Sequence, residues 1–221
     1  MTYIVDHIPR SNPYNRRPGI GMSPTTITIH NTGNPSSSAS NERAWLTNPS
    51  NGRQASFHIV VDEQQAIECL PLNEVAWHAG DGHGNGNMRS IGIEICESGD
   101  YGKTLQNAAE LVAKMLLERN WGIERLRRHF DWSGKVCPRL MYSSGKWTAW
   151  DRFKLMVSRE LDELKGVDAD LENVNVEVND KKVLDGVMIN GISYIPARVV
   201  GESLGAKVDW DGKSRTVRIT K

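Results

Sequence analysis

The sequence of 221 residues predicts an α/β domain followed by a small α+β domain. In the first part of the chain, short segments typical of β-strands are interleaved with longer segments of helical periodicity, which is the pattern of an α/β fold. A polar stretch without periodicity then interrupts this pattern. Beyond it, two hairpin signals flank one short helical segment. We therefore divide the chain into a first domain (residues 1–164), a linker (165–173) and a second domain (174–221).

Three strands are predicted in the first domain. Residues 25–30 alternate polar and apolar side chains and are rich in β-branched residues, and residues 55–61 form a second apolar run. Residues 90–95 form a third strand whose isoleucines share one face. Because side chains alternate along a strand, Gly92 and Glu94 share the opposite face.

Three segments of the first domain have features of helices. Residues 105–119 and 148–164 place apolar side chains at spacings of three and four, and residues 41–46 form a shorter candidate. Thr104 is the expected N-cap of the 105–119 helix, and Ser40 is that of the 41–46 helix. In such a fold we expect the chemistry on loops at the strand ends.

The second domain has its own pattern of strands and turns. Residues 174–178 alternate, and Asn190-Gly191 stands between two apolar runs, which is a strong hairpin signal. A short helix is predicted over residues 196–204, because proline favours a first helical turn and a glycine follows. Residues 208–219 form the second predicted hairpin.

Composition excludes several classes of partner. Lys plus Arg and Asp plus Glu each number 27, so the formal net charge is zero, and the balance holds on both sides of Leu164. The basic excess of nucleic-acid-binding proteins is missing. No apolar run approaches the ~20 residues that span a membrane. The N-terminal residues lack the basic-then-apolar pattern of a signal peptide. Three cysteines, an odd and sparse set, favour a reducing compartment over a disulfide framework.

Two histidines and a cysteine are candidate metal ligands. His30 ends a predicted strand, and His129 and Cys137 lie eight residues apart in one polar segment. Imidazole and thiolate are good zinc ligands, and three of them leave a fourth position for water, as in catalytic sites. The spacing alone matches no standard zinc finger. The residues by themselves leave open that His30 only ends a strand and that Cys137 is a buried apolar residue.

Two charged residues are candidates for catalysis. Glu94 is a carboxylate in an otherwise apolar strand, and near a metal it would serve as a general base. Lys135 lies two residues before Cys137, so in an extended segment both project to the same side, where a cation would stabilise an oxyanion. The alternatives are an exposed strand carboxylate and a solvated loop lysine. Aromatic residues beside polar loops, Phe57 and Trp77 among them, suit binding of sugar or peptide.

Five blocks of sequence, in order, carry a family resemblance. They are Ile29-His30-Asn31-Thr32, Ser56-Phe57-His58-Ile59-Val60-Val61-Asp62, Ala76-Trp77-His78-Ala79-Gly80, Ser90-Ile91-Gly92-Ile93-Glu94 and the segment from His129 to Pro138. Over residues 20–160 the chain closely resembles the zinc-dependent N-acetylmuramoyl-L-alanine amidases of the type-2 amidase family. This family includes phage endolysins and is related to peptidoglycan recognition proteins.

The resemblance implies a mixed β-sheet flanked by helices, with a zinc cleft at one edge. It implies that Zn²⁺ is bound by three residues, namely His30, His129 and Cys137. It also implies that Glu94 and Lys135 assist catalysis.

The cysteine ligand is similar to that of the phage-lysin branch. Four further residues are expected to bind substrate, namely Phe57, Trp77, His78 and Asn87, whereas His58 is expected to be structural. Several family members carry tyrosine where this chain has Phe57, so the hydroxyl is missing and more weight falls on Glu94 and Lys135.

The second domain resembles the copper-amine-oxidase N-terminal-like repeat of bacterial envelope proteins. The resemblance lies in four short segments, at residues 187–191, 194–198, 204–210 and 216–219. Residues 174–221 contain no histidine and no cysteine, so no copper site is expected. The expected role is attachment to the cell wall, with a secondary wall polymer as a possible ligand.

Together these resemblances imply a hydrolase of bacterial peptidoglycan. It would cleave the amide between N-acetylmuramic acid and L-alanine with zinc-activated water, as a phage or prophage endolysin that lyses cell walls. The missing signal peptide fits an enzyme held in the host cytoplasm until it is released onto the wall, without nucleic-acid or membrane partners. Two alternatives are a non-catalytic peptidoglycan-binding protein and a zinc hydrolase of another amide.

Overall fold

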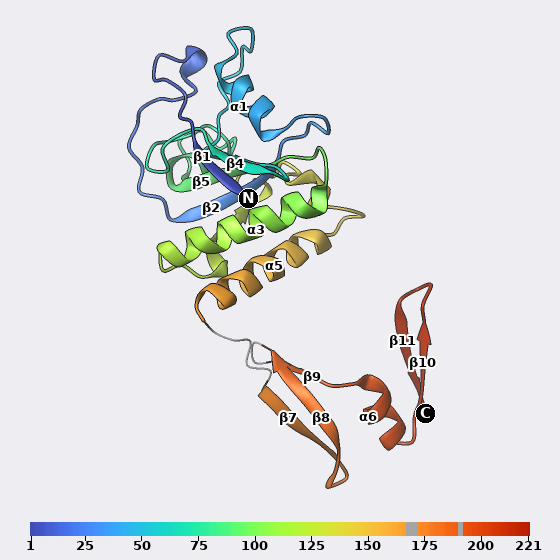
Figure 1. The fold of residues 1–221 in the computed structure, drawn as a ribbon. Coiled ribbons are helices and arrows are strands. Elements are labelled where there is room, and N and C mark those ends of the chain that lie inside the picture. Colours follow the sequence, from blue (N-terminus) through green and yellow to red (C-terminus); the bar gives the residue numbers. More distant parts are fainter. Residues whose placement is uncertain (167–171, 190–191) are drawn as a thin grey trace. The chain divides into compact units, whose positions relative to one another are not determined.

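The computed structural model describes residues 1–166, 172–189 and 192–221. The chain forms two compact units, residues 1–165 and residues 166–221 (Figure 1). Among the described residues, no helix combines the length and the hydropathy that crossing a bilayer requires.

A six-stranded mixed sheet forms the centre of the first unit. Its strands are β1 (Thr2–Val5), β2 (Thr26–Asn31), β3 (Ile59–Val61), β4 (Gln65–Glu68), β5 (Ser90–Ile95) and β6 (Leu126–Arg128). They lie in the order β1-β4-β3-β5-β2-β6. All neighbours are parallel except β3 and β4, which are antiparallel. The sheet is therefore mixed, and the predicted fold class is confirmed.

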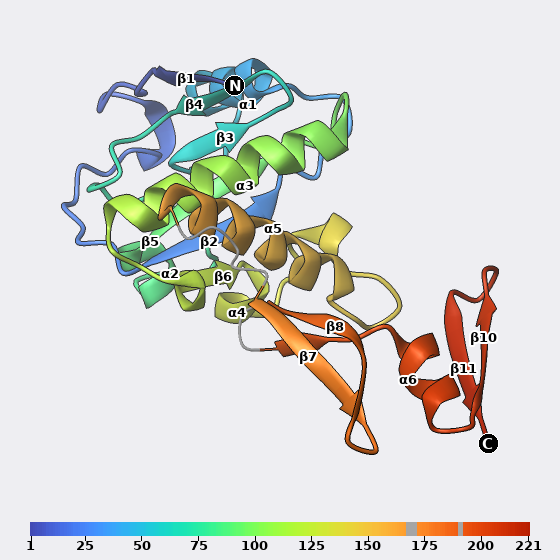
Figure 2. The same ribbon diagram turned by 60° about the horizontal axis from the view of Figure 1, so that its bottom comes forward.

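Helices cover this sheet. They are α1 (Ala39–Thr47), α2 (Asn85–Arg89), α3 (Tyr101–Glu118), α4 (Phe130–Ser133) and α5 (Thr148–Leu164), with short 3-10 turns at Pro13–Asn15, Ile123–Arg125 and Arg139–Met141. Helices α3 and α5 run side by side along one face of the sheet (Figure 2). The isoleucines of β2 and β5 pack with both helices in one core. Burying one such side chain stabilises the fold by about 1.5–3 kcal/mol.

The opposite face of the two central strands carries polar residues. In the register of β2 and β5, His30 lies beside Glu94 and Thr28 lies beside Gly92. These residues alternate with the buried isoleucines, so they project from the sheet on the side away from α3 and α5. One face of the sheet therefore builds the core and the other presents ionisable groups.

Two predicted strands of the first unit agree with the structure, and one is shorter than predicted. Residues 25–30 and 90–95 correspond to β2 and β5, whereas only Ile59–Val61 of residues 55–61 form a strand. The reason lies in Ser56, whose backbone N–H donates to the carbonyl of Trp77 while its hydroxyl accepts from the Trp77 N–H. This segment thus pairs with a loop.

Two helices of the first unit, α1 and α3, begin earlier than predicted. The N-cap of α3 is Asp100, whose carboxylate accepts from the Lys103 N–H, and Thr104 lies inside the first turn. The N-cap of α1 is Ser38, which forms a reciprocal capping box with Asn41. In both cases a polar residue further upstream satisfies the free N–H groups of the first turn.

In its described residues, the second unit contains two antiparallel β-elements and one helix. Its elements are β7 (Glu172–Val178), β8 (Lys181–Ile189), β9 (Ile192–Tyr194), α6 (Ala197–Ser203), β10 (Lys207–Asp211) and β11 (Thr216–Thr220). Strands β7, β8 and β9 form one sheet, and β10 pairs with β11. The predicted Asn190-Gly191 turn lies outside the described residues, between β8 and β9. Gly201 of α6 packs closely on Val208 of β10, and a Cβ at position 201 would lie 2.5 Å from a Val208 methyl group.

Candidate metal centre

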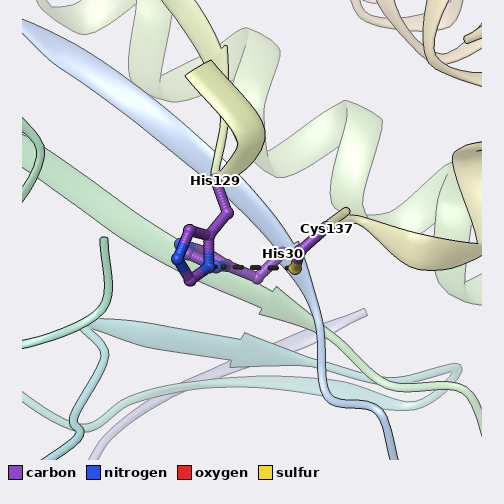
Figure 3. Close-up of side chains that lie close together, drawn as sticks. All are labelled: His30, His129 and Cys137. Atoms are coloured by element: carbon purple, nitrogen blue, oxygen red, sulfur yellow. Dashed lines mark hydrogen bonds between the residues drawn. The ribbon is translucent and has the colours of Figure 1, made fainter. Parts of the chain in front are cut away.

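Three potential ligands converge at one edge of the sheet. His30 lies near the end of β2, His129 follows β6 directly, and Cys137 lies in the loop after α4. Because β2 and β6 are parallel neighbours, the residues at their C-terminal ends meet at the same edge. The Cys137 loop approaches from a third direction (Figure 3). All three side chains are buried.

The spacing of the three donor atoms fits a tetrahedral zinc ion. Nδ1 of His30 lies 3.1 Å from Nδ1 of His129 and 3.8 Å from Sγ of Cys137. All three donor atoms lie within 4.8 Å of one another. With zinc–nitrogen bonds of ~2.0–2.1 Å and zinc–sulfur bonds of ~2.3 Å, tetrahedral angles separate two nitrogens by about 3.3 Å and nitrogen from sulfur by about 3.6 Å. The two separations measured from Nδ1 of His30 are close to these values.

The hydrogen bonds on the far sides of the rings also fit a cation. Nε2 of His129 lies toward Gly80, and the backbone of Ala79 beside the ring raises the pKa of His129. Nε2 of His30 lies 3.1 Å from Nδ1 of His78. With the outer nitrogens engaged in this way, two Nδ1 atoms face each other at close range. A cation between them removes the repulsion of two facing lone pairs.

Burial keeps both imidazoles in the neutral form that binds metal. Desolvation lowers the pKa of His30 well below its usual value, and the charge of Lys135 adds to this effect. The pKa of His129 falls to about 4, first through desolvation and then through Lys135. Burial raises the pKa of the Cys137 thiol to about 12. A bound zinc ion would deprotonate that thiol outright, as it does any coordinating thiol.

Glu94 faces the same group of donors from β5. Its Oε1 lies 4.0 Å from Nδ1 of His30, and its Oε2 is buried without a hydrogen-bond partner. Desolvation raises the pKa of Glu94 to about 8; the nearby charge of Glu42 raises it further, and Lys135 opposes the shift. A carboxylate with a free oxygen and a pKa near neutrality is suited to accept and return a proton.

The donors lie in a cleft of about 500 Å³. Phe57, Trp77 and His78, three of the residues expected to bind substrate, line it, and so does the exposed Lys135. The cleft walls also include residues that sequence reasoning did not select, namely Asn34, Glu42, Trp45 and Arg53. No pattern in the sequence marks Asn34, Glu42 and Arg53 as cleft residues, because they come from loops and from α1.

Asn87 has a different place from the expected one. It is 3% exposed and is not among the cleft-lining residues. Its Oδ1 accepts from the backbone N–H groups of His78 and Ala79, and its Nδ2 donates to the carbonyl of Gly82. All its polar atoms are thus used to fix the loop that leads into α2. This leaves none of them for a substrate.

Both ring nitrogens of His58 form hydrogen bonds with the backbone. Its Nε2 donates to the carbonyl of Glu74, and its Nδ1 accepts from the N–H of Gly92. Since both nitrogens are used, the ring connects the loop after β4 to the middle of β5. It contacts the ring of His78 at a centroid distance of 5.7 Å.

Comparison with protein families gives two matches. The model described as N-acetylmuramoyl-L-alanine amidase matches residues 20–140, which is more than half of the chain. The model described as copper amine oxidase N-terminal domain matches residues 147–221. The first match contains all three donor residues and Glu94, and the second contains the whole second unit.

Two of the curated relatives come from Bacillus subtilis (strain 168). The N-acetylmuramoyl-L-alanine amidase XlyB is 44% identical over 177 residues, which cover 78% of this chain and 53% of the relative. The amidase CwlA is 41% identical over 168 residues, which cover 74% of this chain and 60% of the relative. The chain therefore spans between half and two thirds of the length of these relatives.

Solved structures match the first unit. The catalytic domain of XlyA is 41% identical, with a TM-score of 0.65, and the match covers 71% of this chain and 99% of that one. PlyL is 37% identical, with a TM-score of 0.63, over 72% of this chain and 98% of that one. With the fold, the order of the motifs and the family match in agreement, the chain belongs to the N-acetylmuramoyl-L-alanine amidase family.

Proposed function

We propose that this protein hydrolyses the amide bond between N-acetylmuramic acid and L-alanine in bacterial peptidoglycan. The observation that carries the proposal is the convergence of His30, His129 and Cys137 in one cleft, with Glu94 beside them. This arrangement belongs to a chain of the amidase family. The endolysin role, in which the enzyme reaches the wall from the host cytoplasm, is part of the proposal and rests on the relatives, one of which is described as a mutant endolysin.

His30, His129 and Cys137 would hold a zinc ion. When bound, such an ion supplies Lewis acidity, which polarises a carbonyl group and makes water more acidic. Three protein ligands leave one position open, which is the arrangement of catalytic rather than structural zinc sites. The remaining steps belong to the side chains of the cleft.

Glu94 moves the proton in this scheme. Its unpartnered Oε2 accepts a proton from the attacking water as the new carbon–oxygen bond forms. The same oxygen then gives the proton to the amine nitrogen of L-alanine as the carbon–nitrogen bond breaks. The raised pKa of Glu94 places both transfers within reach at neutral pH.

Lys135 stabilises the negative charge that develops on the carbonyl oxygen. Its ammonium group is exposed in the cleft, and its field already acts on the pKa values of His30 and Glu94. Removing one such stabilising group typically costs a factor on the order of 10²–10³ in rate. Phe57 has no hydroxyl group, so proton transfer and charge stabilisation at this site depend on Glu94 and Lys135.

The test uses purified cell walls and two variants. Glu94→Gln is expected to keep the metal and the fold but to lose wall lysis, whereas Cys137→Ser is expected to lose metal and activity together. Glu110→Gln, on the exposed side of α3, is the matched control and is expected to behave like the wild-type protein.

Mass spectrometry of the released fragments identifies the bond that is cleaved. The proposal predicts peptide-free glycan chains and new L-alanine amino termini. New reducing ends would indicate a glycosidase, and wall binding without any fragments would indicate a non-catalytic binding protein. Either result would overturn the proposal.

The second unit is proposed to bind the cell wall. The support is its match to a separate family model and its division from the first unit as a compact body. We propose a secondary wall polymer as its ligand. The second unit would then keep the catalytic unit close to its substrate by raising the effective concentration.

A further inference from the structure

One buried histidine behind the metal centre has no role in the scheme above. His78 is 7% exposed and lies on the far side of His30 from the other two donors. Its Nδ1 is 3.1 Å from Nε2 of His30, and its own Nε2 is 3.0 Å from the carbonyl oxygen of Ser90. The rings of His30 and His78 meet edge to face, with centroids 5.1 Å apart.

The carbonyl group of Ser90 fixes the direction of the hydrogen bonds between Ser90, His78 and His30. A carbonyl oxygen only accepts, so Nε2 of His78 carries a proton and donates it to Ser90. Both ring nitrogens of His78 face uncharged groups, and burial favours the neutral imidazole. Nδ1 of His78 is then an acceptor, and Nε2–H of His30 must be the donor to it. This leaves Nδ1 of His30 without a proton, directed at His129 and Cys137.

We propose that His78 is a positioning residue that fixes the tautomer and the ring orientation of His30, so that the Nδ1 lone pair of His30 is available to the metal. The inference rests on the proposed zinc site and adds a residue that does not touch the ion. Ligating histidines commonly donate their second N–H to an oxygen acceptor. Here the acceptor is a second imidazole, which passes the interaction on to the backbone of β5.

The neighbourhood of His78 is built around the position of its ring. A Cβ at Gly92 would lie 2.6 Å from Cγ of His78, so only glycine leaves room for the ring on this face of β5. The His58 ring packs on His78 from the side. Asn87 holds the backbone of His78 through a hydrogen bond of 2.8 Å. Gly92 and His58, which lie in the family-like sequence blocks, and Asn87 thus share one role, which is to place the imidazole of His78.

Zinc affinity is the first test of this role. A chromophoric chelator competes with the full-length protein for zinc, and the dissociation constant is compared between variants. His78→Leu is expected to weaken zinc binding by about 10–100-fold, the usual cost of losing such a partner. His78→Asn keeps an acceptor oxygen near the position of Nδ1 and is expected to retain most of the affinity.

Two further variants separate positioning from general damage. Val157→Ala changes a buried core residue of α5, on the face of the sheet away from His30, and it is expected to lower the melting temperature without a comparable loss of zinc affinity. Gly92→Ala displaces the His78 ring without removing a polar group, and its effect on zinc affinity should not add to that of His78→Leu. Wild-type affinity in His78→Leu, or fully additive effects in the double variant, would overturn the inference.

Nitrogen-15 NMR of the zinc-loaded wild-type protein provides a test that needs no variant. The inference predicts that His30 and His78 both carry their proton on Nε2. A proton on Nδ1 of His78 would contradict it while leaving the zinc site in place. A wild-type protein that binds no zinc at all would instead refute the proposed function, so the two failures are distinguishable.

Discussion

Replacing the buried Arg16 with lysine should destabilise the first unit and disturb one wall of the cleft. The Arg16 side chain is fully buried, yet it contacts no carboxylate among the described residues. Its guanidinium instead donates to four backbone carbonyls between residues 46 and 53: those of Leu46 at 2.9 Å, Asn48 at 3.3 Å, Arg53 at 2.8 Å, and Asn51. It also lies over the rings of Tyr14 and Trp45.

The magnitude follows from the number of hydrogen bonds that lysine cannot make. A lysine ammonium lacks the planar arrangement of five N–H groups and would satisfy about two of the four carbonyls. Two lost hydrogen bonds to a charged donor, at about 1.5 kcal/mol each, give roughly 3 kcal/mol. For a unit of this size that corresponds to a fall of about 6–12 °C in melting temperature.

The assay is thermal unfolding of Arg16→Lys beside Arg159→Lys, an exposed control on α5. Because Trp45 and Arg53 line the cleft, KM for cell-wall substrate should rise more than kcat falls. The control should remain within about 0.5 kcal/mol of the wild-type protein. If Arg16→Lys melted within 2 °C of the wild-type protein, the hydrogen bonds from Arg16 to four carbonyls would not stabilise the first unit as described.

Two further predictions concern stability. Arg17 and Arg10 hold the pKa of Glu74 at about 2, below its usual 4.5, so this carboxylate contributes stability above pH 4.5 that is lost as the pH falls toward 2. In urea titrations at several pH values, the free energy of unfolding of Glu74→Gln should therefore fall less between pH 4.5 and pH 2 than that of the wild-type protein, by at most about 3 kcal/mol. An unchanged pH dependence would refute this role. Deletion of residues 166–221 should leave a cooperative melting transition, because residues 1–165 have their own core, but should reduce co-sedimentation with cell walls. Unchanged sedimentation would argue against a wall-binding second unit.

The sequence was most informative where its pattern was long or chemically distinctive. The 148–164 helix and the strand at 90–95 agree with α5 and β5 because their periodicity extends over the whole element. By contrast, β1, β4 and β6 are three or four residues long and were not predicted. Such short strands exist because neighbouring strands pair with them, which is information that a local pattern does not contain.

The residues of the candidate site were likewise predicted only in part. The donors His30, His129 and Cys137 could be selected because their side-chain chemistry is rare and their sequence blocks are ordered. Asn87 was expected to bind substrate, but it lies in α2 with its side chain turned toward the preceding loop, where backbone N–H groups donate to its oxygen. Arg16 gave no signal at all, because its partners are carbonyl groups, which every residue has.

The metal ligands themselves can be observed by X-ray absorption at the zinc edge on the full-length, zinc-loaded protein. The account predicts one zinc per chain with one sulfur at about 2.3 Å and two imidazole nitrogens at about 2.0–2.1 Å. Cys137→Ser should lose the sulfur signal together with most of the bound metal. A zinc ion surrounded only by nitrogen and oxygen in the wild-type protein, with no sulfur neighbour, would contradict the central claim.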